Sequence, residues 1–146
     1  MLGQLESDDR IVIADMEAGA GSLTRMAQGS LDVAVLVVEP SAKSLDVARR
    51  AAAVMRERKI GTLVVAANRV RSEADLDLIR SAVPGVEILA VPDDPAIAQA
   101  DREARSPMDT APGSPGVQAV RELAERLASW ATPVRSVDEL TVLPSQ

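Results

Sequence analysis

Polar residues whose side chains could do chemistry stand at the ends of short apolar runs. Asp15 follows the first run, and carboxylates suit Mg²⁺, which prefers oxygen ligands. Asn68 follows a later run, and its amide can hydrogen-bond to a base edge. Gly19 and Gly21, shortly after Asp15, leave backbone N–H groups free to approach a phosphate. These types and spacings are compatible with phosphate, metal and base contacts at one rim of the sheet.

Each of these residues also has an ordinary structural interpretation. Aspartate and glycine are common where a strand turns toward a helix, and the Asn68 amide can satisfy loop backbone groups. Asp93 and Asp94 are typical of a helix cap, and Glu39 before Pro40 is typical of a turn. Spacing by itself leaves both interpretations open.

The elements that must position these residues follow from the apolar pattern. Unbroken runs rich in β-branched residues predict strands that are buried on both faces. Helical patterns lie between them, with Ser41 and Ser72 placed to cap two of the helices. The sequence therefore predicts an α/β fold with a mostly parallel sheet flanked by helices, whose ligands bind outside the carboxyl ends of the strands. The expected strands are Ile11–Ala14, Val33–Val38, Leu63–Ala67 and Val86–Val91, and the expected helices span 42–59, 72–82, 94–103 and 117–131.

Composition excludes several classes of function. The 146 residues fit one domain, and they include no cysteine and no histidine, which excludes disulfide scaffolds, thiol nucleophiles and the usual zinc sites. The net charge is −6 and Trp130 is the only aromatic residue, so no nucleic-acid partner is predicted. No run approaches the roughly 20 apolar residues of a membrane span. We expect a cytoplasmic protein with one domain over residues 1–131 and a tail over 132–146.

Four segments together resemble a known family. Ile-Val-Ile-Ala-Asp-Met-Glu-Ala-Gly (Ile11–Gly19) resembles the Walker B and switch II segment of MinD/ParA-type ATPases, and its Asp-Met-Glu-Ala-Gly form is similar to the CooC-like branch. Val37–Leu45 is similar to the next strand and helix start of that branch. Val65–Val70 resembles its V-x-N-K-V segment, with Arg69 in place of lysine. Val91–Ile97, with the residues that follow to Pro107, resembles a late loop and helix.

This resemblance implies a P-loop NTPase fold of the SIMIBI type, with ATP and Mg²⁺ as cofactors. It implies that Asp15 holds Mg²⁺ through water and that Gly19 senses the γ-phosphate. It also implies that Asn68 faces the adenine, whose ring is walled by Pro92, Asp93 and Asp94. Proteins of this kind act as dimers on a metalloenzyme-maturation or positioning partner, so a homodimer or heterodimer is expected.

The sequence departs from the family at the phosphate loop. The deviant Walker A pattern K-G-G-x-G-K-T is absent, and Lys43 and Lys59 are the only lysines. Phosphoryl transfer depends on those missing parts, so no ATP hydrolysis is expected of the chain as written. The expected function is that of the C-terminal portion of a longer ATPase. The alternative is a non-catalytic module that pairs with a complete ATPase or another partner; a receiver-like or flavodoxin-like domain fits the residues less well.

The missing loop also predicts an open slot in the sheet. In the family, the phosphate-loop strand lies between the strands that match Ile11–Asp15 and Val33–Glu39. Without it, each of these apolar strands would show an unpaired edge, and such edges recruit a partner or aggregate. Either the two strands pair directly or a strand from another segment fills the slot, and we expect the second arrangement.

Overall fold

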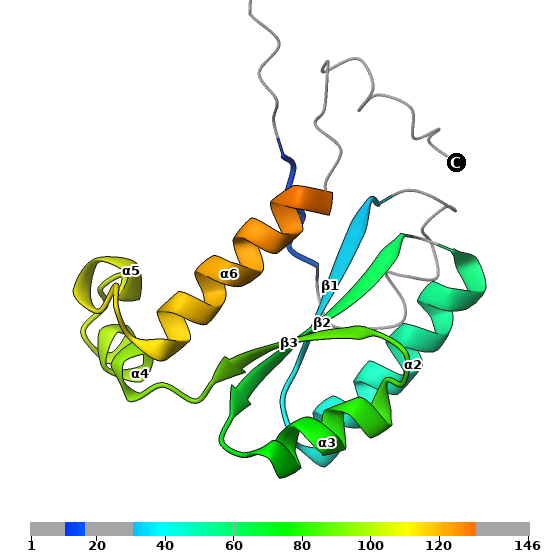
Figure 1. The fold of residues 1–146 in the computed structure, drawn as a ribbon, viewed down its shortest axis with the longest axis horizontal. Coiled ribbons are helices and arrows are strands. Elements are labelled where there is room, and N and C mark those ends of the chain that lie inside the picture. The colour runs from blue at the N-terminus through cyan, green and yellow to red at the C-terminus, as the bar shows by residue number, and fades with distance from the viewer. Residues whose placement is uncertain (1–10, 17–30, 60, 131–146) are drawn as a thin grey trace, which may run out of the picture.

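The sheet has three parallel strands in the order β1-β2-β3. The computed structural model describes residues 11–16, 31–59 and 61–130 (Figure 1). The ladder between the first two strands runs from Val33 opposite Thr62 to Val38 opposite Ala67. This sheet, with helices on its faces, confirms the predicted α/β class. The strands are β1 (Val33–Val38), β2 (Thr62–Val70) and β3 (Glu87–Pro92).

The predicted strand at Ile11–Ala14 is wrong. These residues have no regular secondary structure, and the side chains of Ile11, Val12 and Ile13 are 50%, 58% and 89% exposed. An apolar run becomes a strand only when a neighbouring backbone completes its ladder. Within the described ranges β1 pairs with β2 alone, so its other edge supplies no such ladder to Ile11–Ala14.

Two helices cover one face of the sheet. α2 (Ala42–Arg58) is capped by the Ser41 hydroxyl, and α3 (Glu73–Ala82) by the Ser72 hydroxyl, as the sequence predicts. The apolar stripe of α2 is buried, and α2 ends where Lys59 takes a left-handed backbone conformation. These two helices and one sheet face form the core. Its members are Val38, Leu45, Ala48, Ala52, Val65, Ala67, Ile79, Ala82 and Val83.

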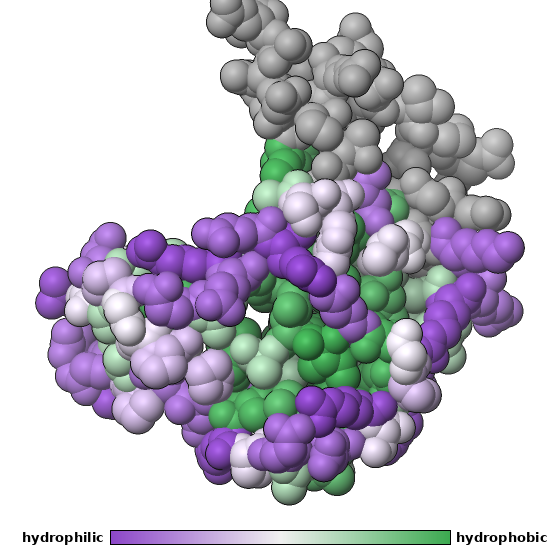
Figure 2. Space-filling view, in the orientation of Figure 1, coloured by the Kyte–Doolittle hydropathy of each residue, from purple (hydrophilic) through white to green (hydrophobic). Residues whose placement is uncertain are grey.

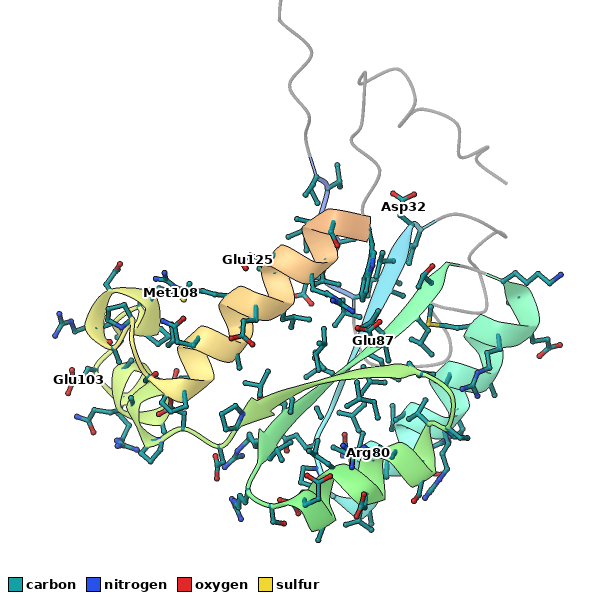
Figure 3. All side chains as sticks on the ribbon, in the orientation of Figure 1. Asp32, Arg80, Glu87, Glu103, Met108 and Glu125 are labelled. Carbon is teal, nitrogen blue, oxygen red and sulfur yellow. The ribbon has the colours of Figure 1, made fainter. Side chains whose placement is uncertain are left out.

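The opposite face is only partly covered. Here α4 (Pro95–Arg102) and α5 (Pro107–Thr110) lead into α6 (Pro115–Trp130), which packs across β3 (Figure 1). Arg126 on α6 pairs with Glu87 on β3 at 2.8 Å, and Figure 3 shows Glu87 and Glu125 on these two facing elements.

The apolar stripe of α6 is buried only in part. Leu123 and Leu127 are half-buried, but Val120 is 40% exposed and Ala124 is exposed. α6 contacts β3, whereas the side chain of Val37 on β1 remains 62% exposed. The part of the α6 stripe that does not pack on β3 is therefore left exposed. Figure 2 shows apolar atoms on the surface between α6 and the other helices. No helix in the described part combines the length and apolar character needed to cross a bilayer.

Candidate nucleotide-base site at the ends of two strands

β2 bends near its carboxyl end. The pairing with β3 shifts between Ala67 and Val70, so Asn68 and Arg69 fall within a bulge. Arg69 has a φ of 57°, which is unfavourable for any residue with a Cβ by about 1–2 kcal/mol. The predicted strand ends at Ala67, but in the structure the pairing with β3 resumes at Val70 after the bulge. Bulges of this kind commonly re-aim a side chain beside a site.

The bulge presents Asn68 at the carboxyl rim of the sheet. Its side chain is half-buried. None of the described residues makes a hydrogen bond with its side-chain amide. The structural alternative, in which Asn68 satisfies loop backbone groups, is therefore not what the described part of the chain shows. The amide keeps one acceptor and two donor hydrogens available to a ligand.

The turn after β3 is tied to the end of β2 through Asp93. Arg71 Nε donates to Asp93 Oδ2 at 2.7 Å, and Arg69 Nε donates to Oδ1 at 3.3 Å. The backbone N–H of Asp93 donates to the Val70 carbonyl at 2.9 Å. The Arg71 hydrogen bond, with a smaller contribution from Arg69, lowers the pKa of the Asp93 carboxyl. We call Arg69, Arg71 and Asp93 the brace.

Asp94 has a different task. Its Oδ1 accepts from the Ala96 N–H at 2.8 Å, capping α4, and its Oδ2 accepts from the Gly116 N–H at 2.8 Å. The Ser114 hydroxyl, together with these two N–H groups, lowers the pKa of Asp94. The Ser114 contact falls short of full hydrogen-bond geometry. Of the two predicted capping residues, only Asp94 caps the helix, and it also fixes the start of α6.

The brace is a feature of the fold that the sequence patterns did not predict. Arg69 was noted only as the residue that replaces lysine in the V-x-N-K-V segment, and Arg71 was not singled out. A usable signal was present, because residues two apart on a strand share a face. The run Asn-Arg-Val-Arg before the Asp-Asp pair therefore places two guanidinium groups near two carboxylates at one rim. The pairing depends on β2 and β3 being neighbours in the same direction, which the local sequence does not specify.

Comparisons with known proteins show which proteins the chain is similar to. No model of a known protein family matches the chain. The chain is 36% identical over 84 residues to an uncharacterized ATP-binding protein of Methanocaldococcus jannaschii, covering 56% of this chain and 32% of that protein. It is 32% identical over 102 residues to the carbon monoxide dehydrogenase accessory protein CooC of Rhodospirillum rubrum, covering 69% of this chain and 39% of CooC.

Solved structures agree with these relatives. The cell division ATPase MinD of Pyrococcus furiosus matches with a TM-score of 0.52 at 25% identity, over 68% of this chain and 44% of MinD. The MinC:MinD complex of Aquifex aeolicus matches in fold, with a TM-score of 0.56 at 22% identity, over 72% of this chain and 46% of that one. The chain is related to the MinD/ParA/CooC-like P-loop ATPases. It spans less than half the length of these relatives.

The other predicted site residues precede β1 in the chain. Asp15 lies in the exposed 11–16 segment, while Gly19 and Gly21 lie outside the described residues. Among the residues that the structure describes, no three acidic groups are clustered so as to hold a metal ion. Glu39 lies just before α2, and its backbone N–H donates to the Ser44 hydroxyl at 3.0 Å. The roles of Asp15 and Gly19 stay predictions.

Two surface grooves of the described part lie away from this rim. One groove runs between β3 and α6 and is bordered by Glu87, Glu122 and Glu125. Another lies at the amino ends of β2 and β3, between Arg56, Lys59 and Val86. Neither groove is lined by Asn68, Pro92 or Asp93.

Proposed function

We propose that this chain supplies the adenine-binding side of a MinD/CooC-like ATP-binding unit, as the C-terminal portion of such an ATPase. The observation that carries the proposal is the half-buried Asn68 amide, which the bulge presents without a hydrogen-bond partner in the described part. Related proteins support it, since two are named ATP-binding proteins and a Pyrococcus horikoshii MinD structure contains Mg-ADP.

The described residues fit the base better than the phosphates. An asparagine amide can donate to and accept from the two neighbouring polar atoms on an adenine edge. Pro92 and Asp93 lie at the end of the adjacent strand, and we propose that they flank that base. The residues do not fit the phosphates in the same way, because the sequence holds no G-K-[ST] pattern and the described residues form no metal cluster. We therefore propose that the chain binds the base and does not itself hydrolyse ATP.

The phosphate loop would have to arrive on a strand beside β1. β1 consists of six apolar residues whose far edge pairs with no described strand, and Val35 and Val37 are 38% and 62% exposed. A second copy of this chain is a poor occupant. Antiparallel pairing of two β1 strands in centred register would set Asp32 of one copy beside Glu39 of the other at both ends. We propose a strand from a different segment as the occupant.

ADP should stabilise the chain against thermal unfolding, because a ligand that binds only the folded state raises stability by mass action. The Asn68→Ala substitution should weaken ADP binding about tenfold, the effect of losing roughly one well-made hydrogen bond to the base. Thermal shift and calorimetric titration with ADP measure both effects. GDP is the control ligand, since guanine presents different groups on the corresponding edge.

The same titration has two informative failures. A wild-type chain that gains no stability from millimolar ADP would contradict nucleotide binding by this chain. Equal ADP affinities for wild type and Asn68→Ala would remove Asn68 from the base site. With ATP, an Asp15→Asn variant that loses the Mg²⁺-dependent part of the shift would support the metal role predicted for Asp15.

A second candidate function is a non-catalytic interaction module, which the open edge of β1 favours. Such a module would pair through β1 with a complete ATPase or a maturation partner as a heterodimer. The Val37→Lys substitution, on an exposed position, should abolish a complex isolated from the source cells while leaving ADP binding unchanged. Leu78→Lys, exposed on α3, is the matched control. A complex that survives Val37→Lys would place the partner elsewhere on the chain.

A further inference from the structure

One carboxylate connects the ends of two neighbouring strands. Asp93 follows β3, and both its carboxylate oxygens are taken by arginines from the last residues of β2 and just beyond. Its own N–H closes the same junction by donating to the Val70 carbonyl at 2.9 Å. Asn68 precedes Arg69 on β2, and Pro92 precedes Asp93 on β3. The contacts of Asp93 therefore join the two strand ends that are proposed to flank the base.

Folding stability does not explain this junction. The Arg69 and Arg71 side chains are 55% and 69% exposed, and exposed ion pairs contribute little to stability. Arg69 also keeps an unfavourable positive φ that glycine would adopt freely. Locally strained residues of this kind are concentrated at binding sites, where the surrounding contacts hold them in place. The strain and both ion pairs converge on the rim that presents Asn68.

We propose that Asp93, held by Arg69 and Arg71, is a positioning residue that fixes the Pro92–Asp93 turn relative to the Asn68 amide and so sets the width of an adenine site. This inference rests on the proposed function. Without the brace, the Asp93 side chain would no longer tie the turn to β2, and the backbone bond from Asp93 to Val70 would remain as the link between them. Binding a base would then first require ordering the turn, which costs affinity that a preorganised site retains.

Loss of the brace should change the discrimination between bases more than it changes the folding stability. Selection of adenine over guanine requires that the amide of Asn68 meet the correct edge atoms, so it needs a fixed ring position. A wall that moves can accept either purine. Loss of the brace should therefore reduce the preference for ADP over GDP, in addition to weakening ADP binding.

The test compares Arg71→Ala and Asp93→Asn with Arg50→Ala. Arg50 is a matched control because its side chain is 65% exposed, close to the 69% of Arg71, and it also pairs with an aspartate, Asp46 on α2. ADP and GDP affinities are measured by calorimetry, the melting temperature by thermal scan, and exchange of the Asp93 amide hydrogen by NMR. We expect Arg71→Ala and Asp93→Asn to bind ADP about three- to fivefold more weakly, with a reduced ADP preference, while their melting temperatures match that of Arg50→Ala.

Exchange of the Asp93 amide hydrogen should accelerate in Arg71→Ala, since the turn is freed, and Arg71→Lys should restore part of both properties. Unchanged ADP affinity and base preference in Arg71→Ala and Asp93→Asn, in a wild type that binds ADP, would overturn the positioning role and leave the proposed function standing. Unchanged exchange of the Asp93 amide in Arg71→Ala would also overturn it, whatever the nucleotide results. A wild type that binds no ADP would overturn the proposed function, and the positioning role with it.

Discussion

Replacing Ile79 with alanine should lower the free energy of unfolding by about 3 kcal/mol, with a range of roughly 2–5. Ile79 lies on α3, is 0% exposed and belongs to the core between the two helices and the sheet. Removing its terminal carbons leaves a cavity that the packed neighbours Val65 and Ala82 can fill only in part. Urea unfolding followed by circular dichroism measures the change.

Leu78→Ala is the control for this substitution. Leu78 is the preceding residue of α3, and its side chain is 50% exposed. Its loss should cost less than about 1 kcal/mol, because little apolar surface leaves a packed environment. Equal losses at the two positions would mean that α3 does not pack on the sheet as described.

The Gly116→Ala substitution should destabilise the chain by about 1–3 kcal/mol. A Cβ at this position would stand 2.7 Å from Asp94 Cβ and 2.7 Å from Ile97 Cδ1, closer than packed atoms approach. The start of α6 would have to move away from α4. That movement would break the hydrogen bond between the Gly116 N–H and the Asp94 carboxylate.

Gly113→Ala, three residues earlier in the same connection, is the matched control. A Cβ at Gly113 would meet no atom within 4 Å, so its substitution should be close to neutral. Thermal and urea unfolding of the two variants distinguish a steric effect at Gly116 from a general preference for glycine in this turn. Equal stability of the two variants would contradict the close approach of α4 and α6.

The uncovered face has consequences for both candidate functions. α6 buries only Gly116 and Val117, and β1 keeps exposed valines beside its free edge. An apolar edge of this kind pairs readily with an added strand. The proposed phosphate-loop strand and the proposed interaction partner therefore compete for the same position.

Several features of the chain were predictable because they depend on local interactions. Ser41 and Ser72 cap their helices through hydroxyls that accept from N–H groups three residues later. The apolar run at Val33–Val38 is a strand, and the helix of 42–59 ends within one residue of the prediction. Four family-like segments in order were sufficient to indicate the MinD/CooC-like relationship.

The tertiary structure decided what depends on neighbours distant in the chain. Ile11–Ala14 has the composition of a strand but no ladder partner, and α6 has an apolar stripe that β3 alone cannot bury. The bulge that presents Asn68, and the carboxylate of Asp93 between two arginines, exist only because β2 and β3 lie side by side. The helix caps, the apolar runs and the family could be predicted from the residues alone, since these depend on residues close together in the chain. Which strands pair, and therefore which polar groups meet at the rim, was decided only by long-range packing.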